Sequence, residues 1–207
     1  MAVLAGCGRL LAVGAGVEAV KKLIPDYYGQ VEVACINGPS ATVLAGSEET
    51  LLKCKALMKQ KNVPSTLIQG DIAFHSSMLD PAIPVIRSQL AFLDGAGSRT
   101  AHLAQFISTV TGEEEKTMSA EYWCRNLRGT VQFQRAIETV FSDPKTSPDL
   151  VIEVSDIMQE PGVQMLYERL PMTSCMLNAD CGLLSRLFFR WGLTGRCWFL
   201  PKRSWLA

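Results

Sequence analysis

The stretch VEVACINGPSATVLAG, Val31–Gly46, decides how the N-terminal part of this chain folds. Its first six residues alternate in polarity, as a strand does when one of its two faces is buried. The tetrapeptide NGPS that follows is rich in residues that favour turns, and ATVLAG is a second apolar segment of strand length. The stretch therefore predicts a β-hairpin.

The segments on either side of the hairpin extend it to a β-α-β-β-α-β unit. Before it, a short apolar strand precedes a helix whose apolar residues share one face. After it, Ser47 is placed to cap a second helix, which has acidic residues in its first turn and lysines near its end, and an apolar strand follows. The predicted segments are LLAVG at 10–14, VEAVKKLI at 17–24, the helix after Ser47 and VPSTLIQ at 63–69. This order predicts a ferredoxin-like α+β subdomain over residues 9–70.

RNA-binding modules share the same order of elements and are the alternative at this stage. They stack bases on aromatic side chains of the central strands and carry a basic surface. Neither feature is visible in the predicted strands of this sequence. The subdomain is therefore not expected to bind nucleic acid.

Composition narrows the choice of partner and compartment. The chain has 207 residues, 20 basic and 20 acidic, so no net charge attracts nucleic acid or an anionic membrane. Its seven cysteines include no C-x-x-C pair, which argues against a disulfide framework and against zinc. The apolar start lacks a basic leader region, and no apolar run is long enough to cross a bilayer. We expect a cytoplasmic protein with no metal, no cofactor and no membrane partner.

Downstream of the subdomain the pattern changes to helices. Asp80 and Pro81 are expected to begin a helix that runs to about Phe92. SAEYWCRNLRGTVQFQRAIETVF predicts two helices that are broken at Gly129, and PDLVIEV predicts a buried strand. His102 lies in an acidic loop without a metal-ligand pattern around it, so it is given no role.

The segment IAFHSSMLDP places His75 directly before two serines. A neutral imidazole can take the proton of a hydroxyl group near pH 7 and activate it as a nucleophile. However, neighbouring side chains usually point away from each other, so Ser76 and Ser77 are poor partners for this imidazole. From the residues alone, a packed or surface histidine remains the alternative to a catalytic one.

These segments together resemble a known family. LLAVG, VEVACINGPSATVLAG, IAFHSSMLDP, EYWCRNLRGTVQFQRAIE and LVIEVS, in this order and spacing, are similar to the malonyl-CoA:acyl carrier protein transacylase-like acyltransferase domains of polyketide synthases and animal-type fatty acid synthases. The resemblance covers roughly residues 5–155. It implies an α/β fold in which residues 9–70 form the small subdomain, 71–157 the C-terminal part of an α/β-hydrolase-like core and 158–207 a divergent linker or tail.

The resemblance also assigns roles to three residues. His75 matches the catalytic histidine of the family, and Asn126 matches the position whose backbone carbonyl orients the imidazole. Phe74 matches a residue beside the acyl pocket, where an aromatic side chain accompanies malonyl substrates. The implied partners are acyl-CoA, specifically malonyl-CoA, and a phosphopantetheinylated acyl carrier protein.

The serine nucleophile of the family stands in a G-H-S-x-G elbow, and this sequence contains no G-x-S-x-G. Cys7 is not a convincing replacement, because nothing near it in sequence lowers the pKa of its thiol. We therefore expect the chain by itself to be inactive. Two functions remain open: a part of an acyltransferase whose serine comes from another segment, or a non-catalytic scaffold or carrier-protein interaction piece.

The tail of the chain departs from the family pattern. Residues 183–191 predict an amphipathic helix with arginines on its polar face. Such a helix can lie on a membrane surface, but docking on its own domain is the commoner use.

Overall fold

The chain divides into two units, Met1–Thr139 and Val140–Ala207. The computed structural model describes residues 6, 8–94, 105–142, 144 and 147–148, together with the backbone of two strands at 151–154 and 196–199. The predicted helix at 183–191, Cys7 and His102 lie outside these residues.

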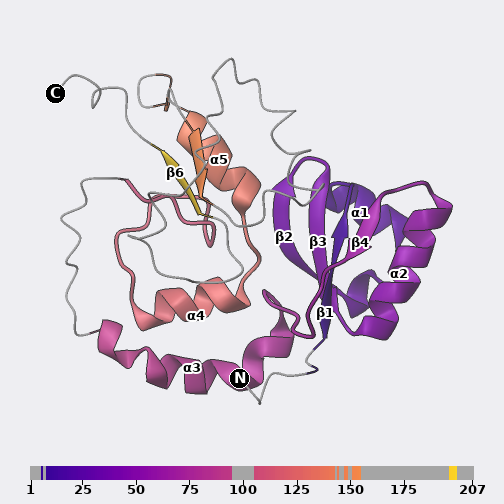
Figure 1. Ribbon diagram of the computed structural model, residues 1–207, viewed down its shortest axis with the longest axis horizontal. Coiled ribbons are helices and arrows are strands. Elements are labelled where there is room, and N and C mark those ends of the chain that lie inside the picture. Colours follow the sequence, from indigo (N-terminus) through magenta and orange to yellow (C-terminus); the bar gives the residue numbers. More distant parts are fainter. Residues whose placement is uncertain are drawn as a thin grey trace, which may run out of the picture. The chain divides into compact units, whose positions relative to one another are not determined.

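A four-stranded antiparallel sheet organises the first unit (Figure 1). Its strands are β1 (Arg9–Val13), β2 (Glu32–Gly38), β3 (Ala41–Gly46) and β4 (Ser65–Leu67), in the spatial order β2-β3-β1-β4. Helix α1 (Val17–Leu23) and the 3-10 helix η1 (Tyr28–Gln30) connect β1 to β2, and helix α2 (Glu48–Gln60) connects β3 to β4. The predicted hairpin and the β-α-β-β-α-β order are confirmed, and the order of strands is that of a split β-α-β unit.

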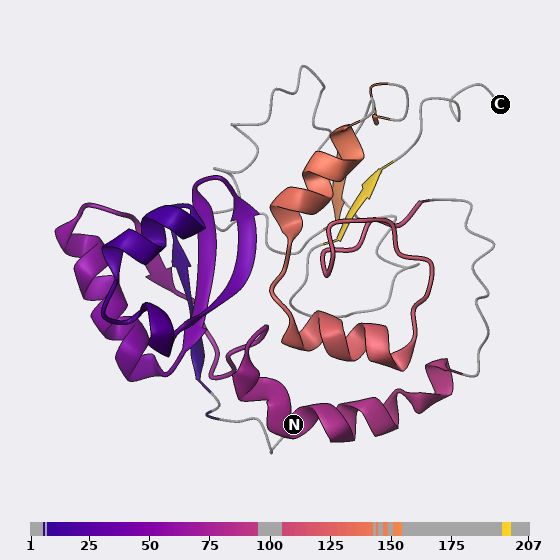
Figure 2. The same ribbon diagram turned by 180° about the vertical axis from the view of Figure 1, so that it is seen from behind.

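The helices α1 and α2 pack on one face of this sheet (Figure 2). The Ser47 side chain caps α2, as predicted, by accepting a hydrogen bond from the backbone N–H of Thr50. Apolar side chains of the strands interdigitate with one stripe of each helix, which removes them from water. The buried members of this core are Leu11, Val13, Val20, Ile24, Val31, Leu44, Leu51, Cys54 and Met58.

The opposite face of the sheet receives the segment that carries the candidate histidine. Side chains alternate along a strand, so Val43 and Ala45 point away from the helices while Leu44 points toward them. Val43 and Ala45 pack with Ala34 and with Ala73, which precedes His75 by two residues. The loop after β4 is thereby anchored on the sheet.

The prediction that Asp80 caps the next helix is wrong. The residue that caps the segment is Ser76, whose hydroxyl accepts a hydrogen bond from the N–H of Met78. The element that begins there is a 3-10 helix, η2 (Ser77–Ala82). An α-helix, α3 (Ile83–Gln89), follows, and a further 3-10 helix, η3 (Ala91–Leu93), ends the segment. Two prolines without N–H groups, at 81 and 84, interrupt regular i→i−4 bonding, which explains why the segment is not one continuous α-helix.

The two helices predicted around Gly129 are confirmed as α4 (Ala120–Arg128) and α5 (Phe133–Phe141). Between them the chain pairs with strand β2. The N–H of Val131 donates to Ala34 O at 2.8 Å, the N–H of Ile36 donates to Val131 O at 2.8 Å, and the Thr130 hydroxyl donates to Val33 O at 2.8 Å. These bonds place the C-terminal end of α4 beside the small subdomain.

In the described part of the second unit, strand β5 (Val151–Val154) pairs with β6 (Arg196–Phe199) in antiparallel fashion. The first of these is the strand predicted from PDLVIEV, whereas the second was not predicted. The boundaries at 70 and 157 proposed from the sequence stay predictions. No helix in the described part of the chain is long and apolar enough to span a membrane.

Candidate active site

His75 has an unusual backbone. It lies in the loop between β4 and η2 with φ +60°, in the left-handed region that non-glycine residues seldom occupy. Such a conformation costs about 1–3 kcal/mol and persists only where the surroundings enforce it. Here the His75 N–H donates to the carbonyl oxygen of Leu127, near the end of α4, at 3.0 Å. Backbone strain of this kind concentrates at functional sites, which makes His75 the first candidate in the fold.

The imidazole of His75 is oriented by the main chain. Its Nδ1 atom lies 3.1 Å from the carbonyl oxygen of Gly129. A carbonyl oxygen can only accept a hydrogen bond, so Nδ1 carries the hydrogen. In the neutral ring Nε2 then keeps its lone pair, and this nitrogen is free to act as a base.

The surroundings also keep this ring neutral. Burial lowers the pKa of His75 below its ordinary value of 6.5, and backbone hydrogen bonds with Gly129 and Asn126 oppose that shift in part. At pH 7 the imidazole is therefore mainly unprotonated. A neutral ring with a fixed tautomer is the state that a general base requires.

The lowered pKa predicts how stability depends on pH. Below about pH 6.5 the unfolded chain binds a proton at His75 that the folded chain does not yet bind. The free energy of unfolding should therefore fall as the pH decreases from 6.5 to the folded-state pKa, and His75→Gln should reduce that fall. Urea unfolding of both proteins at several values between pH 5 and pH 8 measures the difference. Identical pH profiles would contradict the assigned shift.

The two serines next to His75 serve the backbone instead of the imidazole. The Ser76 hydroxyl is buried and donates to Ala73 O at 2.7 Å. The Ser77 hydroxyl donates to the carboxylate of Glu32, which also accepts the Ser77 N–H at 2.9 Å. Both hydroxyl groups thus already have partners, in agreement with the expectation that neither is activated by its neighbour.

The structure brings the three residues chosen from the sequence into one region. The ring centroids of Phe74 and His75 are 6.5 Å apart, at an interplanar angle of 50°. Asn126 lies in the last turns of α4, and its backbone is among the causes that raise the pKa of His75, whereas the carbonyl that meets Nδ1 is that of Gly129. Sequence reasoning missed Gly129, whose carbonyl contacts Nδ1. The predicted helix break at Gly129 was the feature of the sequence that could have indicated it. Gly129 has extended backbone angles, φ −83° and ψ 155°, so its carbonyl does not take part in the hydrogen bonding of the helix.

Metal ligands do not gather in this region. Among the residues that the structure describes, no three His, Cys, Asp or Glu side chains are grouped to hold a metal ion.

The described part of the chain thus presents a split β-α-β unit followed by a loop histidine whose Nδ1 is held by a backbone carbonyl. The chain belongs to the acyl transferase domain family, which matches residues 1–177. The resemblance identified from the sequence is confirmed, and so is the α/β fold class.

Similar proteins are polyketide synthases. The chain is 31% identical over 161 residues to the low-reducing polyketide synthase drtA of Aspergillus calidoustus, a match that covers 76% of this chain and 7% of that protein. It is 34% identical over 176 residues to the polyketide synthase GfsA of Streptomyces halstedii, covering 77% of this chain and 2% of that protein. The chain therefore spans only a small part of either relative.

One solved structure shows the same fold at similar identity. The acyltransferase domain from module 8 of the salinomycin polyketide synthase is 32% identical, with a TM-score of 0.54. The match covers 68% of this chain and 33% of that one.

Proposed function

We propose that this chain forms the C-terminal part of an acyltransferase domain that moves malonyl units from coenzyme A to the phosphopantetheine thiol of an acyl carrier protein. The observation that carries the proposal is the hydrogen bond between His75 Nδ1 and Gly129 O, because it leaves Nε2 as the basic nitrogen. Membership of the acyl transferase domain family supplies the class of reaction.

In the proposed reaction His75 moves one proton in each half. Nε2 takes the proton of a serine hydroxyl while the serine oxygen attacks the thioester carbonyl, and the coenzyme A thiol leaves with that proton. In the second half the carrier thiol gives its proton to Nε2 and its sulfur attacks the serine ester. The serine oxygen then leaves and recovers the proton, so the enzyme is regenerated.

The serine itself is proposed to come from a segment outside this sequence. The 207 residues contain no G-x-S-x-G, and Ser76 and Ser77 are engaged with Ala73 and Glu32. A surface that such a segment would cover is available on α3 and η3, where Val85 is 55% exposed and Phe92 is 70% exposed.

Phe74 provides a test of the proposed substrate. In a protein that joins a G-H-S-x-G segment of a relative to this chain, transfer from malonyl-CoA to a carrier protein is expected. We expect Phe74→Ser to raise the kcat/KM ratio of methylmalonyl-CoA to malonyl-CoA by about tenfold, the lower range for one methyl group in a pocket. Leu52→Ser is the control, because it changes an exposed apolar residue on α2, outside the surface proposed to contact the added segment. A folded fusion without transfer would contradict the function, and an unchanged ratio would remove only the role of Phe74.

A further inference from the structure

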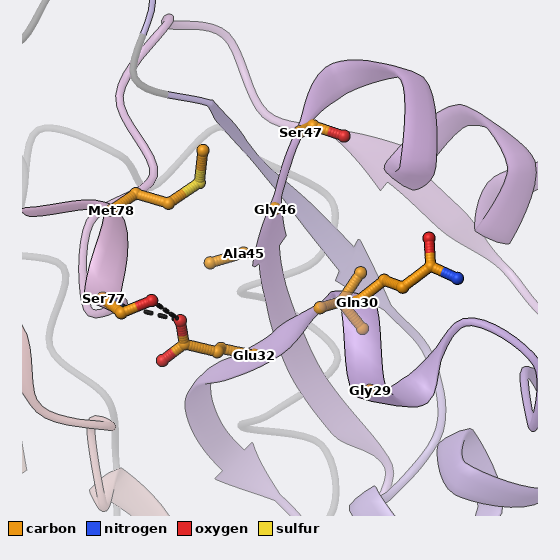
Figure 3. Close-up of a pocket in the computed structure, with 9 residues that line it drawn as sticks. Gly29, Gln30, Glu32, Ala45, Gly46, Ser47, Ser77 and Met78 are labelled. Carbon is orange, nitrogen blue, oxygen red and sulfur yellow. Dashed lines mark hydrogen bonds between the residues drawn. The ribbon is translucent and has the colours of Figure 1, made fainter.

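One carboxylate forms hydrogen bonds between strand β2 and the loop that carries His75, in addition to the packing of Ala73 on the sheet. Glu32, the first residue of β2, accepts both the N–H and the hydroxyl of Ser77, which follows His75 by two residues (Figure 3). These bonds lie at the wall of a cavity of about 320 Å³ between the start of β2, the end of β3 and η2. Hydrogen bonds to an ionised carboxylate are shorter and stronger than neutral ones.

The same carboxylate also reaches the end of α4. Its second oxygen accepts a hydrogen bond from Nη1 of Arg128 at 3.4 Å, and Nε of Arg128 donates to Asp80 in η2. Arg128 stands between Leu127 and Gly129, whose carbonyls accept hydrogen bonds from the N–H and Nδ1 of His75. Glu32 therefore contacts both the segment that presents the histidine and the segment that orients it.

The two segments depend on Glu32 to different degrees. The end of α4 is also held to β2 by the backbone bonds of Val131 and by the Thr130 hydroxyl. For the loop at 75–77, the Glu32 carboxylate is the hydrogen-bond partner that joins Ser77 to β2. Removing the carboxylate should loosen the left-handed turn at His75 while the Gly129 carbonyl stays in place.

We propose that Glu32 is a positioning residue for His75. By fixing the loop at Ser77, the Glu32 carboxylate holds the imidazole against the Gly129 carbonyl. The ion pair with Arg128 contributes little to stability, because both side chains are more than a third exposed. The effect of Glu32 is therefore geometric. The importance of Glu32 for acyl transfer rests on the proposed function. The effect of Glu32 on the orientation of the imidazole is independent of that function.

The chain offers a direct readout because it has only two histidines, His75 and His102. In the full chain labelled with ¹⁵N, the shifts of Nδ1 and Nε2 report the tautomer of each ring, and His75→Gln assigns the signals. We expect unsubstituted His75 to carry its hydrogen on Nδ1. In Glu32→Ala the Nε2–H form, which free histidine prefers in water, should become substantially populated, while the signals of His102 stay unchanged.

Two further variants complete the experiment. Glu32→Gln keeps the shape of the side chain and a neutral acceptor, so it should restore most of the Nδ1–H form. Glu113→Ala removes another exposed ion pair, with Arg135, that does not contact the loop, and it should leave His75 unchanged. In a serine-bearing fusion, Glu32→Ala should lower kcat by about tenfold to a hundredfold, the range for a displaced catalytic group, with little change in KM.

The outcomes separate this proposal from the proposed function. A folded Glu32→Ala chain with an unchanged His75 tautomer would overturn the positioning role, whatever the fusion does. If Glu32→Ala does not fold, Ser77→Ala decides, because it removes the hydroxyl that donates to the Glu32 carboxylate. A smaller tautomer shift in the same direction supports the role, and unchanged spectra contradict it. A tautomer shift in a chain whose fusion transfers no acyl group would leave the positioning role standing and contradict only the function.

Discussion

Replacing His75 with alanine is expected to lower acyl transfer by at least about a hundredfold in a fusion that supplies the serine elbow, since a positioned base contributes about that much. The reason is the orientation of the ring: Nδ1 is tied to Gly129 O, so Nε2 is the nitrogen that can accept the serine proton. Without it the hydroxyl must lose its proton to water. Transfer of radiolabelled malonyl groups to a carrier protein, followed over time, measures the loss.

The other histidine of the chain is the matched control. His102→Ala removes the same type of side chain from a position to which the sequence assigns no role, and it should leave transfer unchanged. Equal transfer by the His75→Ala fusion and the unsubstituted fusion would exclude His75 from the mechanism. A folded fusion that transfers nothing at all would favour the scaffold function.

The chain without any added segment is expected to gain no stable acyl adduct when it is incubated with malonyl-CoA or acetyl-CoA. A general base needs a placed nucleophile and donors for the oxyanion. The two serines that follow His75 in sequence do not meet this need, because Ser76 donates to Ala73 O and Ser77 donates to Glu32. Intact-mass spectrometry after incubation measures the outcome.

Thiols are the expected source of weak background labelling. Burial raises the pKa of Cys35 to about 12 and also raises the pKa of Cys54 and Cys124, so few of these thiols are ionised at pH 7. Hydroxylamine at neutral pH strips thioesters faster than oxygen esters and removes this background. A stoichiometric adduct that survives the treatment and disappears in His75→Ala would mean that a serine of this chain has become the nucleophile.

Local patterns in the sequence determined most of the small subdomain. Alternating polarity placed the hairpin, and the Ser47 hydroxyl and its neighbouring charges placed the start of α2, because both signals act within a few residues. The same reasoning failed at Asp80. An aspartate before a proline is a good local cap, but here that carboxylate binds Arg128, which lies 48 residues away, and Ser76 caps the segment instead.

In the candidate site, too, the sequence predicted one part and the tertiary structure was needed for the other. The sequence alone could name His75 through its resemblance to a family, yet it left a surface or packed histidine open. Only the tertiary structure decided that the ring nitrogen meets the carbonyl of Gly129, 54 residues away, and that Glu32 holds Ser77, 45 residues away. Hydrogen bonds between such distant residues depend on how the loop, the end of α4 and strand β2 come together, and a local pattern of residue types carries no information about that geometry.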